Sequence, residues 1–394
     1  MKARRSSPWR RVPIVDLCTA HVDCVNRTAP AVREPTPFKM IRTTNVKDGF
    51  IDTDNVRFVT EATYRKWTRR LVPRRGDVIL TREAPLGDVG KVRNDDLLFL
   101  GQRLYHFRND PHKLDADFLL YSLLGPDLQA QIRSFGSGST VEHMRLSDIP
   151  QLEILAPDVS EQRSIAGILA AHDDLIDNAR RRIAILEEMT RALFREWFVQ
   201  FRFPGYRELP TTRSHLGAIP QGWMPRQLGD IITLHYGKAL KLELREEGNV
   251  PVFGSSGVVG THNTPLVKGP GIIVGRKGNV GSIFWSDESF YPIDTVYFVS
   301  SQFPLRFVYH ELQRKNFLNS DAAVPGLNRN QAYSLPTVVP TADIMDLFCR
   351  HANALEGEAS LLRRQVQNLC RTRDLLLPRL LSGELRVPTS ANTL

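Results

Sequence analysis

An internal repeat is the feature of this chain that most constrains its fold. Residues 78–87 (VILTREAPLG) and 272–281 (IIVGRKGNVG) each carry three apolar residues, a small residue, an Arg and a Gly five residues later. Apolar residues followed by a charged loop with Gly or Pro predict a buried strand that runs into a turn. Residues 104–107 and 296–299 match in the same way, as do the later prolines Pro157 and Pro340. The repeat predicts two similar globular units in a chain of 394 residues.

A long amphipathic helix is predicted after each unit. Apolar residues recur at alternating spacings of four and three over residues 165–197, and again 183 residues later over 348–380. This heptad spacing is typical of supercoiled helices. We name twelve of its apolar members the heptad seam: Ile165, Leu169, Ile176, Ile183, Leu186, Leu193, Phe348, Leu355, Leu362, Val366, Leu369 and Leu376. His172, Thr190 and Arg373 are polar residues at seam positions.

Two helices of similar length in one chain can pair with each other in antiparallel orientation. The alternative is that each helix packs on its own domain, although such helices are usually shorter than about 20 residues. We therefore expect an α+β fold in which a pair of long antiparallel coiled-coil helices separates two globular domains with pseudo-two-fold symmetry. We expect a first domain at 1–157 and a first helix at 158–201, followed by a Pro- and Gly-rich connector at 202–222. A second domain at 223–340 and a second helix with its tail at 341–394 follow the connector.

The charge distribution favours an anionic partner for the globular parts. The chain has a formal net charge of +9. Residues 1–157 hold 25 Lys and Arg against 19 Asp and Glu, whereas 161–200 hold 6 against 7. Phosphates attract a basic surface whatever the base sequence, so nucleic acid is a candidate partner. No apolar run is long enough for a membrane span, and no secretory signal is evident, so we expect a cytoplasmic protein without a membrane partner.

The sequence carries few signs of catalysis or of a metal site. It has no phosphate-binding P-loop, no His-Glu-x-x-His, no Gly-x-Ser-x-Gly and no Pro-Pro dipeptide of the kind found in amino-methyltransferase motifs. Cys18, His21 and Cys24 have metal-like spacing, but structural zinc needs four ligands and no second pair follows. We expect no catalytic residues, no bound metal and no cofactor in this chain.

Several segments resemble type I restriction–modification specificity subunits. Residues 160–169 (SEQRSIAGIL), running on to 195–198 (REWF), are similar to the first conserved region of that family, and 374–383 (DLLLPRLLSG) to the second. Residues 216–223 (LGAIPQGW) resemble the entry into the second target-recognition domain, while 76–87 and 271–281 match the recurrent motif of such domains. The resemblance covers nearly the whole chain.

This resemblance implies a division of labour. Each target-recognition domain would read one half of a split target in double-stranded DNA, and the helices would set the spacer between the halves. The chain would have no catalytic activity of its own. Two modification subunits, which bind S-adenosylmethionine and methylate adenine, would dock on the helices. Restriction subunits that use ATP and Mg would complete the complex.

Polar residues in the loops between strands are the candidates for DNA contacts, because base edges are read by side-chain donors and acceptors. We name them the unit 1 loop cluster, which comprises Arg82, Glu83, Gln102, Arg103, His143 and Arg145, and the unit 2 loop cluster, which comprises Arg276, Lys277, Asn279, Asn328, Arg329 and Asn330. Ordinary solvated loops are the alternative. Phe194 and Phe198 lie off the heptad seam and are expected to dock a partner.

A second function remains open on sequence alone. A coiled-coil scaffold that binds proteins through its two globular domains would have the same helices and the same lack of catalytic motifs. It predicts partner binding that is insensitive to salt and no affinity for DNA. The basic excess on the globular parts argues against this alternative.

Overall fold

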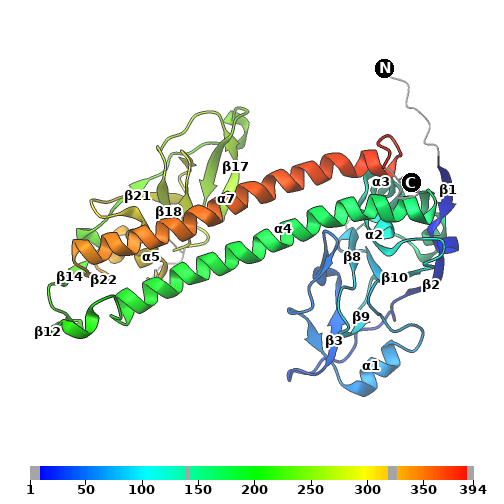
Figure 1. The fold of residues 1–394 in the computed structure, drawn as a ribbon, viewed down its shortest axis with the longest axis horizontal. Helices are drawn as coiled ribbons and strands as arrows, with labels where there is room; N and C mark the ends of the chain where they lie inside the picture. The colour runs from blue at the N-terminus through cyan, green and yellow to red at the C-terminus, as the bar shows by residue number, and fades with distance from the viewer. Residues whose placement is uncertain (1–8, 138–141, 318–325, 388–394) are drawn as a thin grey trace, which may run out of the picture. The chain divides into compact units, whose positions relative to one another are not determined.

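The computed structural model describes residues 9–137, 142–317 and 326–387, which form a mixture of helices and strands (Figure 1). Contacts group the chain into unit 1 (Met1–Asn178 with Val366–Leu394) and unit 2 (Ala179–Gln365). Two long helices, α4 (Val159–Phe194) and α7 (Ala342–Leu381), each contribute to both units. The fold class is α+β.

A four-stranded antiparallel sheet forms the centre of unit 1. Its order is β2-β10-β7-β8, and the strands are β2 (Cys18–Asp23), β7 (Val78–Arg82), β8 (Leu86–Lys91) and β10 (Leu104–Asn109). Helices α2 (Ala116–Leu124) and α3 (Pro126–Ser134) pack against it, and the cluster includes fully buried Leu80, Phe107 and Phe118. The apolar run at the start of β7 is buried on both faces, which explains its continuous rather than alternating pattern.

Smaller elements complete unit 1. Strand β3 (Phe38–Ile41) lies between β6 (Arg57–Phe58) and β9 (Leu97–Leu100), and helix α1 (Glu61–Trp67) packs beside them. Strands β4 (Val46–Lys47) and β5 (Phe50–Ile51) form a hairpin. Strand β1 (Arg10–Pro13) pairs with β11 (Glu153–Ala156), which leads into α4.

Unit 2 repeats the same sheet. Its order is β15-β21-β18-β19, and the strands are β15 (Thr233–Tyr236), β18 (Gly271–Gly275), β19 (Ile283–Ser286) and β21 (Val296–Ser300). Leu104 of β10 lies opposite Thr81, and Val296 of β21 lies opposite Gly275. These are the positions that the sequence repeat pairs, so the repeat is confirmed down to the strand register.

The remaining elements of unit 2 follow the same plan with additions. Strand β14 (Met224–Gln227) pairs with β22 (Pro336–Val339), as β1 does with β11. Helix α5 (Leu305–Gln313) packs on the sheet, and α6 (Arg329–Tyr333) precedes β22. Unit 2 also contains a sheet of β17 (Gly257–His262), β16 (Val250–Gly254) and β20 (Tyr291–Pro292), in that order. Strands β12 (Thr211–Ser214) and β13 (Gly217–Pro220) form a hairpin.

The long helices pack in opposite directions within each unit. In unit 1, Ile165 and Leu169 near the start of α4 share a core with Leu380 near the end of α7. In unit 2, Phe194 at the end of α4 shares a core with Phe348 near the start of α7. No residue of the heptad seam is exposed. Among the described residues, no helix is both long and apolar enough to cross a membrane.

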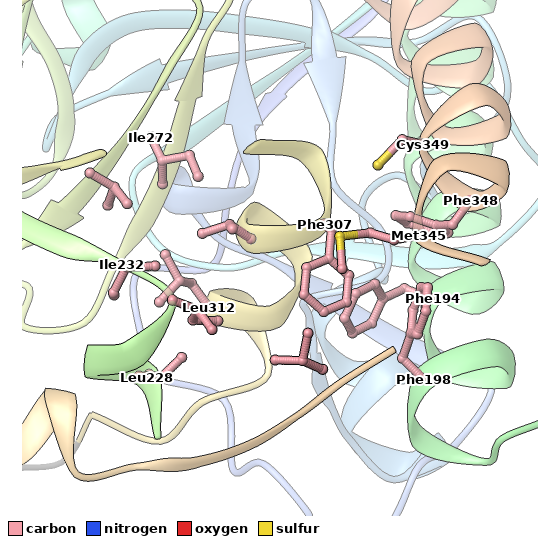
Figure 2. Close-up of a cluster of buried hydrophobic side chains, with 14 of the residues drawn as sticks. Phe194, Phe198, Leu228, Ile232, Ile272, Phe307, Leu312, Met345, Phe348 and Cys349 are labelled. Carbon is pink, nitrogen blue, oxygen red and sulfur yellow. The ribbon is translucent and has the colours of Figure 1, made fainter. Parts of the chain in front are cut away.

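The prediction that Phe194 and Phe198 form a docking surface is wrong. They are 4% and 5% exposed, and Figure 2 shows their rings pointing into the core of unit 2. The Phe194 ring lies 5.8 Å from that of Phe307, and the Phe198 ring lies 5.1 Å from that of Phe348. A π-helical turn over Arg195–Val199 ends α4 at this core. Helical periodicity alone does not reveal the second layer that covers this face.

Candidate nucleic-acid interface

Antiparallel strand pairing assembles the unit 1 loop cluster at one end of the sheet. The loop after β7 and the loop before β10 meet there, and the Arg82 N–H donates to the carbonyl oxygen of Arg103 at 2.8 Å. The N–H of Met144 donates to the Arg82 carbonyl at 3.0 Å, and His143 forms a β-bridge with Glu83. Three segments distant in sequence therefore meet, bringing Gln102 and Arg145 with them as chain neighbours.

The side chains of this cluster combine donors with one carboxylate. The Arg103 Nε lies 3.3 Å from a Glu83 carboxylate oxygen, and Arg82 donates to the Met144 carbonyl at 2.9 Å. Arg103 has φ of 70°, a left-handed conformation that costs a non-glycine residue about 1 kcal/mol or more. Gln102 accepts a 3.4 Å hydrogen bond from Thr28, while His143 and Arg145 are exposed. The end of the sheet thus presents guanidinium, imidazole and amide groups.

The unit 2 loop cluster is built on the same backbone frame. The Arg276 N–H donates to the Thr295 carbonyl at 2.9 Å, and the Arg276 carbonyl accepts from the Leu327 N–H at 2.8 Å. Lys277 forms a β-bridge with Gly326, as Glu83 does with His143 in unit 1. Arg82 and Arg276 are therefore equivalent in structure as well as in sequence.

The asparagines of unit 2 have partly structural roles. The Asn328 side-chain oxygen accepts from the backbone N–H groups of Asn330 and Gln331 at 2.9 and 3.3 Å, which caps helix α6. Asn279 donates to Ser256 at 3.2 Å. Lys277 is exposed in the loop after β18, and Arg329 and Asn330 are exposed in the first turn of α6.

Sequence reasoning missed Tyr236, which ends β15 and is 51% exposed. The guanidinium carbons of Arg276 and Arg329 lie 4.9 and 5.5 Å from the centre of its ring. Its neighbour Tyr297 is buried, and this burial raises the pKa of the Tyr297 hydroxyl. The only signal in the sequence was an aromatic residue at the end of a short strand, which does not reveal its neighbours.

The two clusters differ in charge. Three cations and no carboxylate belong to the unit 2 cluster, whereas Glu83 offsets one of the three arginines in the unit 1 cluster. Across the part of the chain that the structure describes, no group of three or more His, Cys, Asp or Glu is placed to hold a metal ion. Both clusters therefore suit an anionic ligand with hydrogen-bonding edges.

Comparison with known proteins assigns the family. A family model described as the type I restriction modification DNA specificity domain matches residues 7–188 and 220–331, which is more than half of the chain. The chain belongs to the family of type I restriction–modification specificity subunits. The two matched ranges include the residues of both loop clusters.

The chain is similar over most of its length to other specificity subunits. The type I restriction enzyme MjaIX specificity subunit of Methanocaldococcus jannaschii is 25% identical over 366 residues, covering 84% of this chain and 82% of its own length. A crystal structure of a type I restriction–modification S subunit from M. genitalium is similar in fold, with a TM-score of 0.61, 18% identity, and coverage of 97% of this chain and 98% of that one.

Proposed function

We propose that this specificity subunit recognises a bipartite target in double-stranded DNA, with each loop cluster contacting one half and the chain itself catalysing no reaction. The observation that carries the proposal is one backbone frame used twice with different side chains. Arg82 and Arg276 occupy equivalent places, but Glu83 is replaced by Lys277. A shared frame with different donors and acceptors is what two different half-sites require, since base edges are distinguished by those patterns.

The helices would set the spacer between the half-sites and dock two modification subunits. Exposed apolar residues on α4 support this role: Leu175, Ile185 and Met189 are 52%, 60% and 50% exposed. Apolar residues that face solvent on a long helix suit a protein–protein interface. They replace Phe194 and Phe198 as the docking candidates. S-adenosylmethionine, ATP and Mg would bind to the modification and restriction subunits rather than to this chain.

An exchange of one unit tests this proposal. Residues 1–157 are replaced by the corresponding region of a specificity subunit with a known target, and the chain is expressed with its modification subunits. Mapping methylated adenines in genomic DNA should show that one half of the split motif changes while the other half and the spacer stay the same. A change in both halves, or in neither, would refute reading by separate units.

A further inference from the structure

Tyr236 contacts two of the cations of the unit 2 loop cluster, Arg276 and Arg329. Arg276 follows β18, and Arg329 begins α6, so three distant segments bring this tyrosine and two arginines together. Arg276 is also 5.8 Å from the ring of Tyr297 and donates to the Asp294 carbonyl at 2.9 Å. Among the described residues, the Arg329 guanidinium makes no hydrogen bond, and its carbon lies over the Tyr236 ring.

This arrangement leaves hydrogen-bond donors available. A cation–π contact with an aromatic ring uses no N–H group of the guanidinium as a hydrogen-bond donor, so the donors that are not already bonded can bind a partner. The backbone at both arginines is held in place, because the Arg276 carbonyl accepts from Leu327 and Asn328 caps the helix that Arg329 begins. Tyr236 therefore restricts the Arg329 side chain and adds to the contacts with Asp294 and Tyr297 that hold Arg276.

The same position in unit 1 shows that the fold does not require this tyrosine. Tyr105 of β10 lies opposite Asp23, just as Tyr297 lies opposite Tyr236. Asp23 forms an ion pair with Arg70 at 2.5 Å instead of stacking with the loop arginines. Met144 and Leu327 are equivalent, because their N–H groups donate to the carbonyls of Arg82 and Arg276. The residue two positions later is Arg329 in unit 2 but exposed Leu146 in unit 1. The stacked group is thus specific to unit 2.

We propose that Tyr236 is a positioning residue that holds Arg276 and Arg329 to recognise guanine in the half-site contacted by unit 2. An arginine fork matches the O6 and N7 acceptors that guanine presents in the major groove. The inference rests on the proposed function, because it assumes that unit 2 contacts one half-site. It adds the identity of a recognised base and a residue that does not itself need to touch DNA.

The test uses the full chain assembled with its modification subunits. The probe is a duplex carrying the methylated motif, in which guanines of one half-site at a time are replaced by 7-deazaguanine. This base pairs normally but lacks N7. The exchange of residues 1–157 identifies which half-site belongs to unit 2. For the unmodified chain, 7-deazaguanine in that half-site should weaken binding about tenfold, within the range for loss of a base contact.

Variants separate positioning from a structural role. Tyr236→Leu should bind the normal duplex about tenfold more weakly and lose its sensitivity to 7-deazaguanine, whereas Tyr236→Phe keeps the ring and should behave like the unmodified chain. Tyr206→Leu is the matched control, since Arg207 lies 5.8 Å over that exposed ring outside the loop cluster. It should leave both measurements unchanged.

Three outcomes would overturn the proposal while leaving bipartite recognition intact. The unit 2 half-site could contain no guanine, or Tyr236→Leu could retain full sensitivity to 7-deazaguanine. Binding by Tyr236→Leu could also weaken equally on all duplexes with no loss of discrimination, which would indicate phosphate contacts by the arginines. Failure of bipartite recognition itself would appear separately, in the methylation pattern of the exchanged chain.

Discussion

At the scale of single residues, unit 1 contains a buried charged group apart from the loop cluster. Asp77 is 1% exposed just before β7, and its carboxylate is 2.6 Å from His106 Nε2 and 2.7 Å from Arg108. Burial raises the pKa of the Asp77 carboxyl, but hydrogen bonds from Arg108 and His106 outweigh it and lower that pKa to about 2. The carboxylate thus links the start of β7 to β10. This link lies at the end of the sheet opposite to the unit 1 loop cluster.

The lowered pKa predicts acid sensitivity of unit 1. Because the folded-state pKa lies below the unfolded value, the stabilisation is complete above about pH 4 and is lost as the pH falls toward 2. Its size is about 2 kcal/mol from the shift in pKa. Urea midpoints measured from pH 6 to pH 2.5 should fall over this window. Asp77→Asn should cost about 3 kcal/mol at neutral pH and remove this part of the acid response.

A second variant checks that the effect belongs to Asp77. Asp95 is exposed, so Asp95→Asn should keep both the neutral-pH stability and the acid response of the unmodified chain. If Asp77→Asn lost as much stability as the unmodified chain between pH 4 and pH 2.5, the assignment to Asp77 would be incorrect.

At the scale of elements, the polar residues of the heptad positions are all satisfied. His172 bonds to the Ile168 carbonyl at 2.8 Å, and Thr190 donates to the Leu186 carbonyl at 3.0 Å. Arg373 of α7 donates to Asp173 of α4 at 2.8 Å. The hydroxyl of Tyr121 donates to the same carboxylate at 2.7 Å, so α2 joins this contact. The apparent defects in the apolar pattern are therefore hydrogen-bonded sites, one of which links α4 and α7 within unit 1.

The Asp173–Arg373 pair should be sensitive to loss of one partner. Asp173 is 5% exposed, so Asp173→Ala removes the buried acceptor of both Arg373 and Tyr121 and should cost about 3 kcal/mol of unfolding free energy. The double variant Asp173→Ala with Arg373→Met should recover much of that loss, as measured by urea unfolding. The exposed pair Arg182–Glu358 is the control, and Arg182→Ala should cost less than about 1 kcal/mol. Equal losses from both pairs would contradict this ranking.

Gly357 offers a stabilising substitution in α7. It is exposed in the helix, and a Cβ placed there would meet no atom within 4 Å. Gly357→Ala should therefore raise the unfolding free energy by about 0.5–1 kcal/mol, because alanine favours the helix. Gly90→Ala in β8 is the opposite case, since its Cβ would lie 2.5 Å from the Phe50 carbonyl oxygen. Thermal unfolding should rank the first variant above the unmodified chain and the second below it.

At the scale of the whole molecule, the net charge of +9 and the two loop clusters predict DNA binding that depends strongly on salt. Each phosphate contact contributes about −0.9 to the slope of log affinity against log salt. Lys277 is exposed in the unit 2 loop cluster. Lys277→Ala should weaken binding of the assembled complex and reduce the slope by about one, because it removes one positive charge from the interface. Salt-independent binding of partners without DNA affinity would instead favour the protein-binding scaffold.

Sequence by itself determined the repeated strand-loop-strand segments, the two long helices and the choice of loops as the candidate interface. These features follow from local apolar spacing, which is set within a few turns or strands of the chain.

The tertiary structure decided which loops meet. Tyr236 contacts Arg276 and Arg329 only because the strand order β15-β21-β18-β19 brings three distant segments together. The tertiary structure also placed Phe194 and Phe198 in the core of unit 2, since a second layer covers the face of α4 that carries them. Periodicity identifies an apolar face, but which element covers that face depends on long-range packing.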